Sequence, residues 1–218
     1  MKTKAFLLLL LTSTLAFSQY GYRDGNRIGL SAGVSQTTLF TSNFDVKPEY
    51  GFAGGLSVRG NYFDNWSMIY GMQFFNNSFS VATLTPSFLN KDTKYTISGV
   101  QIKLLLSYNI VKDHLSVDFG PVLQVNGKLS LDALDENNII KGTALKANQI
   151  IDVSTLSGNA YIGVSGGGKV IRLLVFYQYG FTNIMSNLNS KDGLNALNNN
   201  KSFTGNLGTV NGQIIFNF

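Results

Sequence analysis

The chain has 218 residues, of which only 13% are charged, against about 25% in an average soluble domain. Its formal charge of +5 comes from scattered lysines and arginines without a basic run, which argues against nucleic-acid binding. The absence of cysteine excludes disulfide bonds, thiolate metal sites and a thiol nucleophile. Few charges, 27 aromatic residues (16 Phe, 10 Tyr and 1 Trp) and 23 glycines are typical of strands with one face in lipid and the other in a polar lumen.

The first 18 residues have the layout of a secretory signal peptide. Two lysines give a positive start, an apolar stretch follows, and Ala16 and Ser18 are the small residues expected before a cleavage site. The apolar stretch is shorter than the about 20 residues that a transmembrane helix needs. We therefore assign 1–18 to a cleaved signal peptide and 19–218 to one exported domain. Its formal charge is +3, because the signal peptide contains two lysines and no acidic residue.

Alternation of apolar and polar side chains with a period of two dominates the exported part of the chain. In each alternating segment, aliphatic and aromatic residues on one face are interleaved with Gly, Ser, Asn and Gln on the other. A tilted strand needs about 9–11 residues to cross the hydrocarbon layer. The pattern predicts eight strands of about this length or slightly longer, at 28–35, 52–62, 66–75, 99–109, 115–126, 156–165, 171–182 and 209–218.

The predicted connections alternate strictly in length. Short turns follow the second, fourth and sixth strands, at 63–65, 110–113 and 167–168. Long polar connections follow the first, third, fifth and seventh strands, at 36–49, 78–94, 128–155 and 183–202. In a meander this puts every long loop at one end, which is the pattern of short periplasmic turns and long extracellular loops.

These observations predict an all-β fold, an eight-stranded antiparallel up-and-down transmembrane β-barrel. Unpaired backbone groups are very costly in hydrocarbon, so the first and eighth strands must pair to close the sheet. An eight-stranded barrel is about wide enough for its own side chains to fill the interior, which argues against a solute channel.

Polar side chains on the inward faces are expected to form a structural network in the lumen. A hairpin turning near Val111 would place Asp118 opposite Lys103 or one diagonal step away, which predicts a buried ion pair. The predicted lumen network comprises Arg59, Gln73, Gln101, Lys103, Asp118, Gln124, Arg172 and Gln178.

Outward aromatic residues are predicted to gather at the two membrane interfaces, as in the aromatic girdles of such barrels. At the short-turn end these are Tyr62, Trp66, Tyr108, Phe216 and Phe218. At the long-loop end they are Tyr50, Phe52, Phe74, Tyr179 and Phe181.

No catalytic, cofactor or metal site is expected. The single histidine, His114, falls at a short turn, so the outer loops lack a histidine base that could activate a serine. Asp132, Asp135 and Glu136 lack the ligand spacing of a calcium loop, and we expect them in a solvated loop. The asparagine-rich segment 195–200 is expected to be a flexible outer loop.

The sequence resembles the small outer-membrane β-barrels common in Bacteroidetes, described as PorT-like or OmpX-like. The resemblance is carried by AFSQ at the predicted cleavage site, RIGLSAGVS, YGFAGGLSVRGNYF and the terminal GQIIFNF. It implies an outer-membrane location, and named members of the family act in protein secretion. The strand that ends at Phe218 is also similar to the signal read by the barrel-assembly machinery, which would make that machinery a partner.

We therefore expect a non-enzymatic integral outer-membrane protein with outer-membrane lipid around it. Its long extracellular loops would bind a protein partner or stabilise the envelope. The alternatives are an accessory component of a secretion or assembly machinery, a lipid A-modifying barrel enzyme, and a soluble periplasmic β-sandwich.

Overall fold

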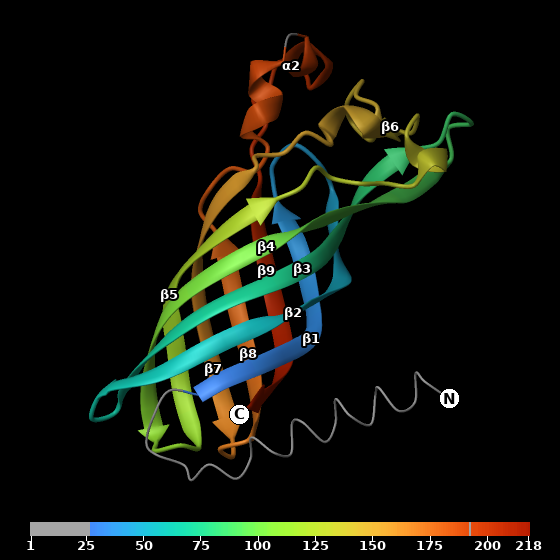
Figure 1. The fold of residues 1–218 in the computed structure, drawn as a ribbon. Helices are drawn as coiled ribbons and strands as arrows, with labels where there is room; N and C mark the ends of the chain where they lie inside the picture. Colours follow the sequence, from blue (N-terminus) through green and yellow to red (C-terminus); the bar gives the residue numbers. More distant parts are fainter. Residues whose placement is uncertain (1–26, 192) are drawn as a thin grey trace, which may run out of the picture.

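The computed structural model describes residues 27–191 and 193–218, in which eight long strands form one closed antiparallel ring (Figure 1). The predicted signal peptide, 1–18, lies outside the described residues. Each of these eight strands pairs with the long strands before and after it in the chain, which confirms the predicted fold class. The eight are β1 (Arg27–Phe40), β2 (Val46–Phe63), β3 (Trp66–Leu84), β4 (Asn90–Val111), β5 (Leu115–Asn126), β7 (Leu156–Gly167), β8 (Ile171–Gly180) and β9 (Asn206–Asn217).

The ring closes between its first and last strands, as predicted. β1 and β9 pair continuously, from Gly29 opposite Asn217 to Phe40 opposite Asn206. Closure gives the backbone N–H and C=O groups of the first and last strands hydrogen-bonding partners, which lipid acyl chains cannot provide. Within the described ranges, no helix is long and apolar enough to span a bilayer.

Three short turns connect strands at the end of the barrel where the C-terminus lies (Figure 1). They span 64–65, 112–114 and 168–170, within two residues of their predicted positions. Asp64 and Asp113 adopt positive φ angles of 45° and 63° in two of these turns. Aspartate tolerates this left-handed conformation better than most residues, because its short side chain can hydrogen-bond locally.

Two of the four connections predicted to be long are mostly strand. Only 41–45 separate β1 from β2, and only 85–89 separate β3 from β4. For β3 and β4 the prediction failed because the pattern of apolar and polar residues inverts outside the membrane-spanning part. In β4 the inward face changes from Gln101 and Lys103 to Ile97 and Tyr95, while the outward face becomes polar. A rule that expects apolar residues outside therefore assigned this segment to a loop.

The other two long connections fold instead of remaining irregular. The first contains β6 (Ile139–Ile140), which pairs with the end of β3, and the short helices η2 (Ala133–Asp135) and η3 (Ala147–Ile150). The second contains η4 (Ser186–Ser190) and α2 (Leu194–Leu197), so the segment predicted as flexible at 195–200 begins within a short helix. Both connections lie beyond the barrel at the end opposite the C-terminus (Figure 1).

These connections and the strand ends next to them form a cap on the barrel, with a hydrophobic core of its own that we call the cap core. It contains fully buried aromatic and aliphatic side chains from widely separated parts of the chain. Phe79 and Tyr95 stack with ring centroids 5.8 Å apart. The cap core also includes Phe44, Val81, Ile97, Leu129, Ile140, Leu145, Ile150, Val153, Ile184, Met185, Leu188 and Phe203.

Candidate functional site: the lumen and the cap

An arginine–aspartate pair occupies the half of the lumen nearest the short turns. Arg59 on β2 donates to both carboxylate oxygens of Asp118 on β5 at 3.3 Å, and it donates to Ser107 at 2.6 Å. Ser107 and Ser116 also donate to the carboxylate, at 2.5 Å and 3.1 Å. Asp118 is only 2% exposed, so these donors replace the water that the carboxylate loses.

The predicted ion pair between Lys103 and Asp118 is wrong. Asp118 lies opposite Ser107, and Lys103 lies opposite Val122, four residues further along β5. The hairpin turns at 112–114, about two residues beyond the predicted centre, with an irregularity in pairing next to it. When the centre of a turn moves by one residue along the chain, the residue opposite a given position changes by two. A shift of about two residues therefore moves the position opposite Lys103 from Asp118 to Val122.

Lys103 lies among aromatic side chains instead. Its ammonium nitrogen is 4.2 Å from the ring centroid of Phe176 and 5.2 Å from that of Tyr161. The negative face of an aromatic ring attracts a cation, most strongly where water is excluded. A small apolar cluster that includes Leu105 and Val122 surrounds this part of the lumen.

Glutamines form a hydrogen-bonded chain across the lumen further toward the cap. Gln73 donates to Gln101, and Gln101 donates to Gln124, each at 2.7 Å. Gln178 on β8 donates to Gln124 at 3.2 Å, and Gln213 on β9 donates to Gln73 at 3.3 Å. The chain therefore links β9, β3, β4, β5 and β8 across the barrel.

Arg172 and Arg27 hold the mouth of the barrel at the short turns. Arg172 donates to the backbone oxygen of Asp113 at 2.8 Å and to that of Ser165 at 3.1 Å. Arg27 forms an ion pair with the Asp113 carboxylate. Burial raises the pKa of Asp113, but the hydrogen bond and charge of Arg27 outweigh it and, with Lys169 and Lys112, leave this pKa below its ordinary value.

The structure thus brings the predicted lumen residues into two hydrogen-bonded groups and leaves Lys103 with aromatic neighbours. The network includes members that the predicted set omits, among them Ser107, Ser116 and Ser165. Their signal in the sequence is an inward position in the two-residue alternation, but a serine at such a position does not stand out from other small residues.

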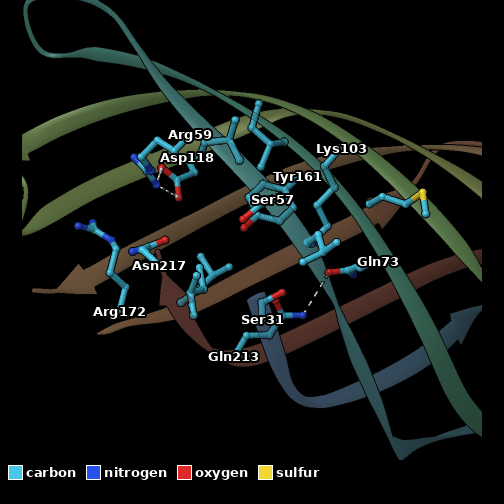
Figure 2. Close-up of a pocket in the computed structure, with 17 residues that line it drawn as sticks. Ser31, Ser57, Arg59, Gln73, Lys103, Asp118, Tyr161, Arg172, Gln213 and Asn217 are labelled. Atoms are coloured by element: carbon cyan, nitrogen blue, oxygen red, sulfur yellow. Dashed lines mark hydrogen bonds and ion pairs between the residues drawn. The ribbon is translucent and has the colours of Figure 1, made fainter. Parts of the chain in front are cut away.

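A cavity of about 40 Å³ remains in the lumen between these groups. One water molecule needs at least about 10–15 Å³ measured in this way, so the space suits a very small occupant. In Figure 2, Arg172 and Asn217 lie at one end of the cavity, and Lys103 and Tyr161 lie at the other. Ser31, Ser57 and Gln213 lie between the two ends.

The outer wall of the barrel exposes large apolar side chains on every strand of the ring. Soluble monomers rarely expose contiguous apolar surface beyond a few hundred Å². Representative outward residues from the eight strands are Leu30, Leu56, Met72, Leu104, Leu123, Ile162, Val175 and Val210.

Aromatic side chains flank this aliphatic wall at both ends. Trp66 and Tyr108 meet edge to face with ring centroids 5.0 Å apart, at the short-turn end. The described aromatic residues of the predicted girdles are all exposed: Tyr50, Phe52, Trp66, Phe74, Tyr108, Tyr179, Phe181, Phe216 and Phe218. The side chain of Tyr62 lies outside the described part of the structure.

The cap presents an apolar tip, formed by Phe88, Leu89 and Leu134. Their exposed fractions are 76%, 68% and 86%. Phe88 has a φ of 59°, a left-handed conformation that is unusual for a bulky residue. An ion pair between Lys91 and Asp135 joins the two segments that carry the tip.

Asp135 is not in a solvated loop as predicted. Its side chain is buried, and it accepts hydrogen bonds from Lys91 and from Asn138. The neighbouring Asp132 accepts a hydrogen bond from the backbone of Leu134 and so begins η2. The acidic residues of this segment shape the cap.

His114 lies at a short turn, where its ring nitrogen is 3.0 Å from the backbone oxygen of Gly167. It is thus at the opposite end of the molecule from the cap. Within the described ranges, no group of three or more histidine or acidic residues is placed to hold a metal ion.

A closed eight-stranded ring, a polar lumen and a lipid-facing apolar wall define a transmembrane β-barrel of the outer-membrane type. The single ring also contradicts the alternative of a soluble sandwich of two sheets.

Comparison with known proteins gives similar folds only. No protein-family model and no curated protein matches the sequence. Neisserial surface protein A is 14% identical, with 91% of this chain and 100% of that chain covered and a TM-score of 0.49. Ail of Yersinia pestis, in complex with the heparin analogue sucrose octasulfate, is 13% identical, with 89% and 99% covered and a TM-score of 0.48.

The outer membrane protein OprG from Pseudomonas aeruginosa is 10% identical, with 91% of this chain and 98% of that chain covered and a TM-score of 0.46. All three TM-scores are below 0.5. The assignment to a class of barrel therefore depends on the closed ring and its lipid-facing wall.

Proposed function

We propose that the protein resides in the outer membrane and uses its cap as a binding surface for an extracellular protein partner. The observation that carries this proposal is the apolar tip of Phe88, Leu89 and Leu134. An exposed apolar patch that is rimmed by polar residues marks an interaction site. The proposal assigns no catalytic role.

The tip is supported by a rigid base, which favours binding. Side chains of β3 and β4 next to the tip are buried in the cap core. The Lys91–Asp135 ion pair joins the β3–β4 hairpin to the connection that contains η2. A surface that is already ordered loses less conformational entropy when a partner binds. The left-handed backbone at Phe88 adds local strain, and such strain is concentrated at functional sites.

Site-specific photo-crosslinking in intact cells tests the proposal. A photoreactive phenylalanine analogue replaces Phe88 in the full chain, and a second variant carries the same analogue at exposed Lys201, which follows α2 in another part of the cap. We expect a discrete adduct of higher mass at position 88 alone. The proposal fails if position 88 gives no adduct, or if both positions give the same one.

An accessory role in a secretion or assembly machinery is the alternative that the PorT-like resemblance supports. Co-purification in mild detergent separates the two roles, because a machinery subunit should bring membrane or periplasmic components with it even when the tip is removed. The triple variant Phe88→Ser, Leu89→Ser, Leu134→Ser should lose an extracellular partner and leave such a complex intact.

A lipid A-modifying activity has weaker support. The only histidine lies near the short turns, far from the outer leaflet. Expression that leaves the mass of lipid A unchanged would agree with a non-enzymatic barrel, and any mass change would contradict it.

A further inference from the structure

The lumen contains more positive than negative charge. Within the membrane-spanning part that the structure describes, Arg59, Lys103 and Arg172 point inward and only Asp118 opposes them. The Arg27–Asp113 pair at the mouth is balanced on its own. Charges without a counter-charge are costly in a low-dielectric interior, so this imbalance calls for an additional anion.

Two of the cations have polar groups without a protein partner. Arg172 is 4% exposed, and its Nε–H has no hydrogen-bond acceptor. No described hydrogen bond or ion pair reaches the ammonium group of Lys103, which contacts only aromatic rings. Arg59, by contrast, is engaged by Asp118 and by serine hydroxyls. The unsatisfied donors are therefore Arg172 and Lys103.

Both of these residues line the same cavity (Figure 2). Ser31 and Ser57 lie between them and Asn217 lies beside Arg172, and the side chains of all three can donate hydrogen bonds. The carboxylate of Asp118 also borders the cavity, but its oxygens already accept from Arg59, Ser107 and Ser116. At about 40 Å³ the space admits a single small ion with little accompanying water, and no bulky organic anion.

We propose that this cavity binds one small inorganic anion of the halide type, chloride under ordinary conditions, between Arg172 and Lys103. The anion accepts the free Nε–H of Arg172 and balances one of the excess lumen charges. It is a structural ion that is taken up as the barrel folds, so it needs no entry path through the finished wall.

The first test measures folding in different salts. The exported domain is refolded from urea into detergent in sodium chloride or in sodium gluconate, each at about 0.15 M, so that screening is equal and gluconate is too large to enter. A chloride excess of about tenfold over its Kd should raise the unfolding temperature by about 3–6 °C. Equal unfolding temperatures in the two salts would overturn the proposal.

A matched pair of variants separates binding from a general salt effect. Lys103→Met removes a cavity cation and keeps an unbranched side chain of similar length, whereas Lys201→Met removes an exposed lysine from the cap. The chloride-dependent rise should disappear in Lys103→Met and persist in Lys201→Met. A rise that is the same in both variants would contradict an ion at this site.

Crystals of the unmodified barrel grown in sodium bromide give a direct answer that needs no variant. An anomalous bromine peak inside the cavity beside Arg172 supports the proposal. A lumen without such a peak overturns it.

Discussion

Replacing Asp118 by alanine should destabilise the barrel strongly. The change leaves Arg59 buried in the lumen without its counter-charge, and Ser107 and Ser116 lose their acceptor. Removing one member of a buried ion pair costs about 3–5 kcal/mol. We expect the lower end, about 3 kcal/mol, because Arg59 keeps 15% of its side chain exposed. At about 2–4 °C per kcal/mol for a chain of this length, the unfolding temperature should fall by about 6–12 °C.

Thermal unfolding in detergent measures this effect, followed by circular dichroism and by the loss of the compact band on a gel. A double-mutant cycle identifies the partner of Asp118. Asp118→Ala should couple to Arg59→Met by about 0.5–3 kcal/mol, and it should be additive with Lys103→Met within about 0.5 kcal/mol. An Asp118→Ala variant that melts with the parent would refute the reasoning, as would stronger coupling to Lys103.

Three further predictions concern the wall and the mouth. Gly99→Ala should lose about 1–3 kcal/mol in chemical denaturation, because its Cβ would lie 2.1 Å from a backbone oxygen, whereas Gly212→Ala meets open space and should match the parent. The lowered pKa of Asp113 means that its pairing with Arg27 stabilises the fold fully above about pH 4 and is lost as the pH falls through the folded pKa. The difference in unfolding temperature between the parent and Asp113→Asn should therefore shrink below that pH, and a constant difference would contradict the pairing. The fluorescence of Trp66, the only tryptophan, should be quenched more by lipids brominated near the headgroup than by lipids brominated at the bilayer centre.

The sequence was sufficient to predict the barrel wherever a strand has lipid on one side and the lumen on the other. Period-two alternation holds there because the two faces meet different surroundings, as for Leu104 outside and Lys103 inside. It was insufficient beyond the membrane, where Tyr95 and Ile97 point toward the cap core and the polar side chains face water. An alternating pattern shows that the two faces of a strand have different surroundings. It does not show whether the apolar face contacts lipid or the protein's own core.

The lumen was predicted in composition but not in its pairings. Side chains alternate between the two faces of a strand, so residues such as Gln101 and Arg172 could be placed inside from the sequence alone. Pairings depend on where each turn is centred, and the turn at 112–114 places Asp118 opposite Ser107 instead of Lys103, while Arg59 pairs with Asp118 from across the lumen. The cap core depends on contacts between distant segments, such as Phe44 with Phe203, and no local pattern encodes these.

The apolar side chains of β3 and β4 have two different environments. In the barrel part of these strands they face acyl chains, and beyond it they pack into the cap core. Mutations at Ile140 or Leu188 therefore act on the cap core and leave the lipid-facing side chains unchanged. Such a division lets the shape of the cap change while the embedded cylinder stays constant.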